Sequence, residues 1–189
     1  MGNLKSALSF GGILSTKDIE YIIGFYKVLK FKPGEEFLSI GKISRQIGFV
    51  DSGILRSYSI GNDMEEVTKY FIRENQFVMD IESFYDNKPS NSGIQAVADC
   101  QILALDRSVW NRLNEEIPKL YILSKSLTEA GLLNKIKDNE FLHFGSAKDK
   151  YLEFARRYPD LTLKVPLQYI ASYLHITPQS LSRIRREIS

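Results

Sequence analysis

The polar residues with the most distinctive chemistry lie near the C-terminal end of this 189-residue chain, directly after Thr177. Gln179 and Arg183 carry side chains that form paired hydrogen bonds with the edges of adenine and guanine, respectively. Ser180 and Ser182 add hydroxyl groups that both donate and accept hydrogen bonds. These residues predict a surface that reads base edges in a DNA groove.

The same segment also carries candidates for contacts with the DNA backbone, namely Lys164, Arg185 and Arg186. From Ser146 to Ser189 the chain has eight basic and four acidic residues, a net charge of +4, whereas the first 145 residues carry −2. This asymmetry places a polyanion-binding surface at the C-terminal end. A simpler reading is that Arg185 and Arg186 complement the negative end of a helix dipole.

Two short helices with a tight break between them would position these side chains. Pro166 suits the first turn of one helix, and Thr177 followed by Pro178 suits the start of the next. His175 and Ile176 fall at the break between the two helices. The hydrophobic residues fall on the inner faces of the two helices and at the corner between them; they are Ile170, Ala171, Leu174, Ile176, Leu181, Ile184 and Ile188. The spacing fits a helix-turn-helix whose second helix enters the major groove.

A further helix precedes this pair. Ser146 and Asp149 form a candidate capping box, which predicts a helix that runs to Tyr158 and is ended by Pro159. The segment from Leu161 to Val165 is rich in β-favouring residues and predicts a short strand. Any wing of the DNA-binding unit would have to come from this strand.

The first half of the chain shows a different pattern. Ser15 and Asp18 predict the start of a helix from about Thr16 to Val28. Short β-rich stretches then follow at close spacing, separated by turn residues: Ile47 to Val50, Ile54 to Ile60, Val67 to Ile72, the alternating Ile94, Ala96 and Ala98, and Gln101 to Leu105. This pattern is typical of a β-sandwich, barrel or jelly roll.

A long helix is predicted between the two regions, after a shorter one over Arg107 to Leu113. It begins at about Pro118 and runs to about Phe141, and its hydrophobic residues recur at helical spacing: Leu120, Leu123, Leu127 and Ala130. This hydrophobic stripe has two interpretations. It packs against the β domain of its own chain, or it forms a coiled-coil seam with a second copy.

Composition excludes several classes of protein. One cysteine and two histidines are too few for a disulfide framework, a cysteine-only zinc site or a four-cysteine iron–sulfur cluster, so no metal and no cofactor is predicted. No hydrophobic run is long enough to span a membrane, and the start of the chain lacks the apolar core of a secretory signal. We expect a cytoplasmic protein.

The order of these parts resembles the Crp/Fnr family of bacterial transcription regulators. The best matching points are Pro33-Gly34-Glu35, Val50-Asp51-Ser52-Gly53 and the segment from Leu167 to Arg186. The resemblance implies an α+β fold with a double-stranded β-helix or jelly roll (residues 1–117), a central dimerisation helix (118–144) and a winged-helix-like helix-turn-helix (145–189). It also implies a homodimer that binds double-stranded DNA, with RNA polymerase and an unidentified small-molecule effector as further candidate partners.

Family members that respond to cyclic nucleotides hold the ligand phosphate with a Gly-Glu pair and a later arginine. In this chain Met79 and Asp80 stand where the pair would be, and the later segment contains Ser90 and Asn91 but no arginine. These four residues mark the predicted ligand pocket. A buried phosphodiester without a cation loses most of its binding energy, and an aspartate repels it. The sequence therefore predicts that cyclic AMP is not bound in the family's usual way.

An enzyme and a ligand-sensing or partner-binding module are the two alternatives to a DNA-binding protein. An enzyme built on the roll would need a catalytic constellation, but neither histidine falls within the roll and no nucleophile–base pair is evident, so we expect no enzyme. A ligand-sensing or partner-binding module without DNA binding is the alternative. The base-reading residues around Arg183 favour a sequence-specific regulator.

Overall fold

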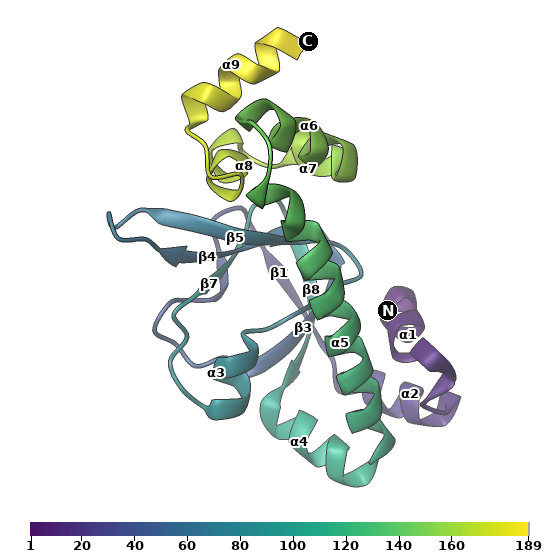
Figure 1. The fold of residues 1–189 in the computed structure, drawn as a ribbon. Coiled ribbons are helices and arrows are strands. Elements are labelled where there is room, and N and C mark those ends of the chain that lie inside the picture. The colour runs from purple at the N-terminus through teal and green to yellow at the C-terminus, as the bar shows by residue number, and fades with distance from the viewer. Residues whose placement is uncertain (189) are drawn as a thin grey trace.

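The computed structural model describes residues 1–188, and its strands form two four-stranded antiparallel sheets that make up a β-roll (Figure 1). The strand orders are β1-β8-β3-β6 and β2-β7-β4-β5. The strand bounds are β1 Lys27–Phe31, β2 Glu36–Leu38, β3 Gln46–Ser52, β4 Leu55–Ile60, β5 Glu66–Ile72, β6 Phe77–Val78, β7 Gly93–Ala96 and β8 Cys100–Asp106. The roll confirms the type of β domain that the spacing of the strands predicts.

Between the two sheets lies a compact hydrophobic core that includes Val50, Leu55, Ile94 and Ile102, all at most 1% exposed. Burial of each such side chain contributes about 1.5–3 kcal/mol, which makes this core a main source of the roll's stability. The predicted turn after β3 also forms. Its Gly53 has a φ of +95°, and a Cβ there would lie only 2.3 Å from the carbonyl oxygen of Asp99, so only glycine fits.

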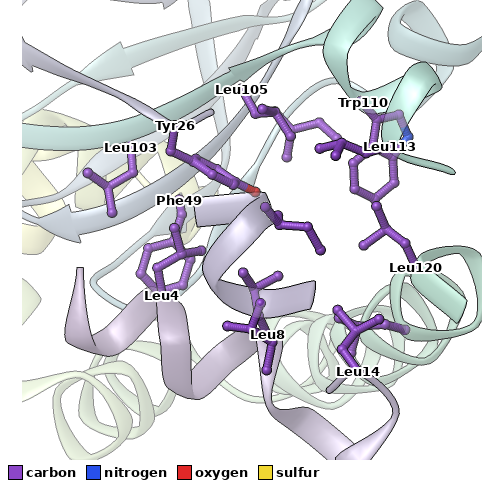
Figure 2. Packing of buried hydrophobic residues seen from close by; sticks show 14 of the residues in the cluster. Leu4, Leu8, Leu14, Tyr26, Phe49, Leu103, Leu105, Trp110, Leu113 and Leu120 are labelled. Atoms are coloured by element: carbon purple, nitrogen blue, oxygen red, sulfur yellow. The ribbon is translucent and has the colours of Figure 1, made fainter. Parts of the chain in front are cut away.

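Helices cover the other side of the first sheet and enclose a second core. They are α1 Gly2–Leu8, a 3₁₀ turn Phe10–Gly12, α2 Thr16–Ile23, α4 Arg107–Glu116 and the start of α5 Lys119–Glu140. Figure 2 shows this core, in which Leu4 and Leu8 of α1 approach Tyr26, Phe49 and Leu103. Leu120 belongs to the same core, so α5 is anchored to the roll at its first turn.

The C-terminal helices, residues 146–188, form a compact group that we call the helical unit. It lies at the opposite end of the molecule from α4 (Figure 1). After a 3₁₀ turn at Phe141–His143 come α6 Ala147–Arg157, α7 Pro159–Lys164, α8 Leu167–Tyr173 and α9 Pro178–Ile188. The predicted capping boxes are confirmed at Ser15 with Asp18 and at Ser146 with Asp149. None of the helices described is both long and apolar enough to cross a bilayer.

Two sequence predictions are wrong. The helix predicted for Thr16 to Val28 ends at Ile23, because the chain turns at Gly24 and residues from Lys27 onward pair with β8. The strand predicted for Leu161 to Val165 is helical instead, since Pro159 begins α7 at its first position and does not terminate structure. Within residues 145–188 no strand remains to serve as a wing.

Two short helices were not predicted. Helix α1 buries only Leu4 and Leu8, too few positions to show periodicity in the sequence. Helix α3, Ile81–Asp86, is capped by Asp80 and buries Ser83 and Phe84. Because α3 lies between β6 and β7, it places Asp80 at the predicted ligand pocket.

Candidate nucleic-acid interface

The break between α8 and α9 has the geometry that the sequence predicts. His175 adopts a left-handed backbone with a φ of +57°, and the amide of Ile176 donates to the carbonyl of Ala171 over 3.0 Å. Thr177 caps α9: its hydroxyl accepts from the amide of Ser180 at 3.1 Å and lies 3.0 Å from the Ser180 hydroxyl. This bonding fixes the start of α9 against the end of α8.

Helix α9 buries one face and exposes the other. Leu181 and Ile184 are at most 5% exposed and pack in the core that joins α6, α8 and α9. The exposed face carries three of the predicted base readers, Gln179, Ser182 and Arg183, together with Arg186, a predicted contact to the DNA backbone. The Arg183 side chain is 73% exposed and lies 3.9 Å from Glu187, a distance that leaves it able to swing toward a ligand.

The remaining predicted DNA contacts lie around this face. Ser180 and Arg185 are half-buried, whereas Thr177 and Lys164 are exposed, Lys164 at the C-terminal end of α7. On α6, Arg156 and Arg157 both bond to Glu153 and hold the pKa of its carboxyl at about 2. The positive charge of these two arginines is therefore partly neutralised within α6.

The predicted ligand pocket is only partly assembled. Asp80 caps α3 by accepting from the amide of Ser83 at 2.9 Å, and the buried Ser90 hydroxyl lies 2.8 Å from the other Asp80 oxygen. Met79 packs against the second core, and Asn91 is exposed. The structure thus brings Asp80 and Ser90 together, and each carboxylate oxygen of Asp80 already accepts a hydrogen bond. Met79 and Asn91 do not take part in this pair.

Two cations were missed by sequence reasoning. Lys69 on β5 donates to the hydroxyl of the buried Ser92 over 2.9 Å, which places an ammonium group at the edge of the same pocket. Arg56 on β4 is 1% exposed. A charged residue inside the otherwise uncharged run Leu55 to Ile60 is the signal that could have drawn attention to Arg56.

Helix α5 carries hydrophobic residues on two opposite faces. Leu120 and Leu123, predicted as dimer contacts, are each 1% exposed and belong to the core of their own chain, so their assignment to an interface is corrected. Leu127 packs partly against this core, and Ala130 is half-buried. The face turned away from it exposes more than half of Ile122, Leu133 and Ile136.

A groove of about 540 Å³ lies along α5, between this helix and β5, β6 and the helical unit. Its lining is mostly apolar and includes Phe71, Phe77, Trp110 and Leu127. Lys135 of α5 closes one part of it, with its ammonium 3.2 Å from the centre of the Tyr70 ring. Its lining also includes Met79 and Ile81, the two neighbours of Asp80 in the chain, but neither Asp80 nor Ser90.

Comparison with known proteins agrees with this architecture. Residues 28–116 match the family model of the cyclic nucleotide-binding domain. No curated protein sequence matches the chain. The match covers the roll from β1 to β8 and helix α4.

Solved structures extend the likeness beyond the roll. The catabolite activator protein of Thermus thermophilus is 17% identical, with a TM-score of 0.59 over 96% of this chain and 86% of that one. FixK2 of Bradyrhizobium japonicum is 19% identical, with a TM-score of 0.68 over 86% and 84%. The c-di-GMP-responsive global regulator CLP of Xanthomonas campestris is 14% identical, with a TM-score of 0.71 over 92% and 91%. The chain therefore resembles the cyclic nucleotide-binding domain over residues 28–116 and shares its fold with these three proteins.

Proposed function

We propose that this protein is a sequence-specific DNA-binding transcription regulator that acts as a homodimer. The observation that carries the proposal is α9, which begins at a tight left-handed corner and exposes Gln179, Ser182, Arg183 and Arg186 opposite its buried face. This is the arrangement by which a recognition helix meets base edges in the major groove. The proposal is also supported by the fold, which this chain shares over most of its length with the catabolite activator protein and FixK2.

Within this proposal the exposed residues have separate roles. Arg183 forms the paired hydrogen bonds with a guanine, and Gln179 does so with an adenine, while Ser180 and Ser182 contact neighbouring edges. Thr177, Lys164, Arg185 and Arg186 contact phosphates, which set the register but not the sequence preference. Since α7 replaces the predicted wing, Lys164 would reach the backbone from the end of a helix.

Dimerisation uses the outer face of α5. Ile122, Leu133 and Ile136 are exposed there, and pairing with a second copy would remove them from water. Two copies related by a twofold axis would present their α9 helices to half-sites about 34–36 Å apart. The groove along α5 is the place where an effector, if one is used, would contact both the roll and the dimer helix.

We further propose that the regulator does not respond to cyclic AMP. A bound phosphodiester needs positive charge and vacant hydrogen-bond donors. At the Asp80–Ser90 pair it would instead meet a carboxylate and a hydroxyl that already bond to groups of the same loop. Of the two nearby cations, Lys88 is exposed and bonds to Asp86, and the ammonium group of Lys69 donates to the hydroxyl of Ser92.

Selection from random duplexes, followed by titration of the selected site at two salt concentrations, tests the proposed function. Arg183→Ala should weaken binding to the selected site by about 1–3 kcal/mol and relax the base preference at one position. Arg45→Ala, at an exposed arginine of the roll, is the matched control and should bind normally. If the intact protein selects no sequence, or if Arg183→Ala retains full affinity and preference, α9 is not a recognition helix.

A further inference from the structure

Arg56 lies on the outer face of the second sheet but is almost fully buried. Its neighbour Leu55 points into the core between the sheets, so the alternation of a strand turns Arg56 outward. It is nevertheless 1% exposed. Its guanidinium carbon lies 3.8 Å from the ring centre of Tyr169 on α8 and 4.6 Å from that of Tyr58. The arginine is thus enclosed between a tyrosine of the roll and a tyrosine of the helical unit.

The guanidinium group is also held in place at its edges. Gln95 accepts from Nε at 2.9 Å and from Nη2 at 2.8 Å, and the carboxylate of Glu66 accepts from Nη2 as well. The hydroxyl of Thr68 lies 3.4 Å from Nη1. These bonds fix the plane of the guanidinium, and Glu66 balances its charge. Arg56 therefore offers Tyr169 a flat and rigid surface.

A second contact lies beside this stack. Strand β5 is an edge strand of its sheet, so the backbone amides and carbonyls on its outer side have no neighbouring strand to bond with. The amide of Thr68 donates to the hydroxyl of Ser172 over 2.9 Å, and this hydroxyl lies 3.4 Å from the carbonyl of Glu66. Ser172 follows Tyr169 by three positions, so both side chains lie on the same face of α8.

Further contacts extend along β5 toward α6 and α7. Phe71 lies edge-on to Tyr173 with ring centres 5.5 Å apart, and its ring centre is 6.3 Å from that of Phe154. Arg73 lies 3.8 Å from the carboxylate of Asp160. The helical unit therefore contacts β5 from Glu66 to Phe71 and also Arg73 just after its end, and a contact of this length opposes rotation as well as separation.

We propose that this contact fixes the orientation of α9 relative to α5 and thereby sets the half-site spacing that the dimer reads. We name the contact the β5 dock and define it by Arg56, Thr68, Phe71, Tyr169 and Ser172. Arg56 and Tyr169 are its positioning residues, since neither lies on the exposed face of α9. The proposal rests on the proposed DNA binding.

The physical reason lies in how two half-sites are bound together. When both α9 helices are held at the right separation, binding of the second follows at high effective concentration. With the dock open, the two units stay joined by the segment between α5 and α6 and by two bonds to α5, from Arg157 to the Lys137 carbonyl and from Tyr173 to Asn139. Each α9 would then sample a wider range of orientations, so the gain from two linked sites falls and the preference for one spacing weakens.

The first experiment needs no DNA. Spin labels on Lys30→Cys and Glu187→Cys, two exposed positions, report the distance from the roll to α9 in labelled chains diluted with unlabelled protein. Cys100 is buried, and burial raises the pKa of its thiol, so it does not compete for the label. We expect a narrow distance distribution that broadens with Tyr169→Leu or Ser172→Ala. Tyr169→Phe, which keeps the ring, should restore the narrow distribution.

The second experiment measures affinity for duplexes in which two selected half-sites are separated by different distances. The intact protein should bind most tightly at one half-site separation, about 10 base pairs from centre to centre or a multiple of that distance. Tyr169→Leu should lose about tenfold or more at that optimum and show a flatter spacing profile, while affinity for one half-site is unchanged. Tyr85→Leu, at an exposed tyrosine of α3, is the matched control.

The two experiments separate the two proposals. If the label distances broaden as expected but no duplex is selected, the dock stands as an orienting contact and the DNA-binding function fails. If Tyr169→Leu leaves the distance distribution or the spacing profile unchanged, or binds the optimal site more tightly, the dock does not set the spacing. Thermal unfolding of each variant verifies that the helical unit remains folded.

Discussion

Phe154→Ala tests whether the helical unit unfolds while the roll stays folded, although the core around Phe154 also includes Ile54 and Val97 of the roll. Phe154 is fully buried, and its ring centre lies 5.4 Å from that of Tyr158 and 5.7 Å from that of Tyr173. Replacing a buried phenylalanine by alanine costs about 3–5 kcal/mol, because the side chain leaves a cavity among its neighbours. A unit as small as residues 146–188 rarely has more than about 3–5 kcal/mol of its own stability. The substitution should therefore unfold the helical unit and leave the roll folded.

Two optical signals distinguish the two units. The chain has one tryptophan, Trp110, which lies in the core between the roll and its N-terminal helices, so its fluorescence reports the roll. Far-ultraviolet circular dichroism reports all the helices, those of the helical unit included. In Phe154→Ala the part of the dichroism signal that comes from α6 to α9 should be lost at a temperature lower by at least about 15 °C, while the fluorescence midpoint changes little.

Phe144→Ala is the matched control, because Phe144 is 71% exposed, and both midpoints should stay where they are. Equal shifts of the two signals in Phe154→Ala would show that the roll and the helical unit unfold as one body. A midpoint that does not move would show that Phe154 is not packed as described. Either result would refute the expectation that the helical unit unfolds separately from the roll.

Three further predictions concern other parts of the molecule. Leu133→Asp on the outer face of α5 should convert the dimer to a monomer in light scattering without lowering the unfolding temperature, whereas a monomeric intact protein would contradict the proposed interface. Calorimetric titration with cyclic AMP should show no micromolar binding, and a micromolar isotherm would overturn the reading of Asp80. Because burial raises the pKa of Cys100, its thiol should stay protonated and unreactive toward a disulfide reagent near pH 8, and react once the chain unfolds; fast reaction in the folded protein would show an exposed thiol.

The sequence predicts the local features of this fold well, because they depend on neighbouring residues. The cap at Ser146 needs only Asp149 three positions on, and the position of the break at His175 follows from the spacing of the two amphipathic helices. The exposed face of α9 follows from helical periodicity alone. Most of the candidate base readers lie on this face, so their exposure could be predicted from the sequence.

What the sequence does not reveal depends on contacts between distant residues. Leu120 and Leu123 have the spacing of a coiled-coil seam, but spacing does not show which side of a helix its own chain covers. The segment from Leu161 has β-favouring residues and still forms a helix, since Pro159 starts a turn and Leu161 packs in the helical core. The enclosure of Arg56 requires Tyr169, which is more than a hundred residues away.

The position of α8 along β5 has a consequence for the roll on its own. A fragment that ends with α5 would leave the outer edge of β5 bare, with the amide of Thr68 unbonded and Phe71 in water. Such an edge recruits strands from other molecules and leads to insoluble assemblies. The helical unit covers this edge in the intact chain, so the shortened fragment should aggregate more readily than the intact chain does.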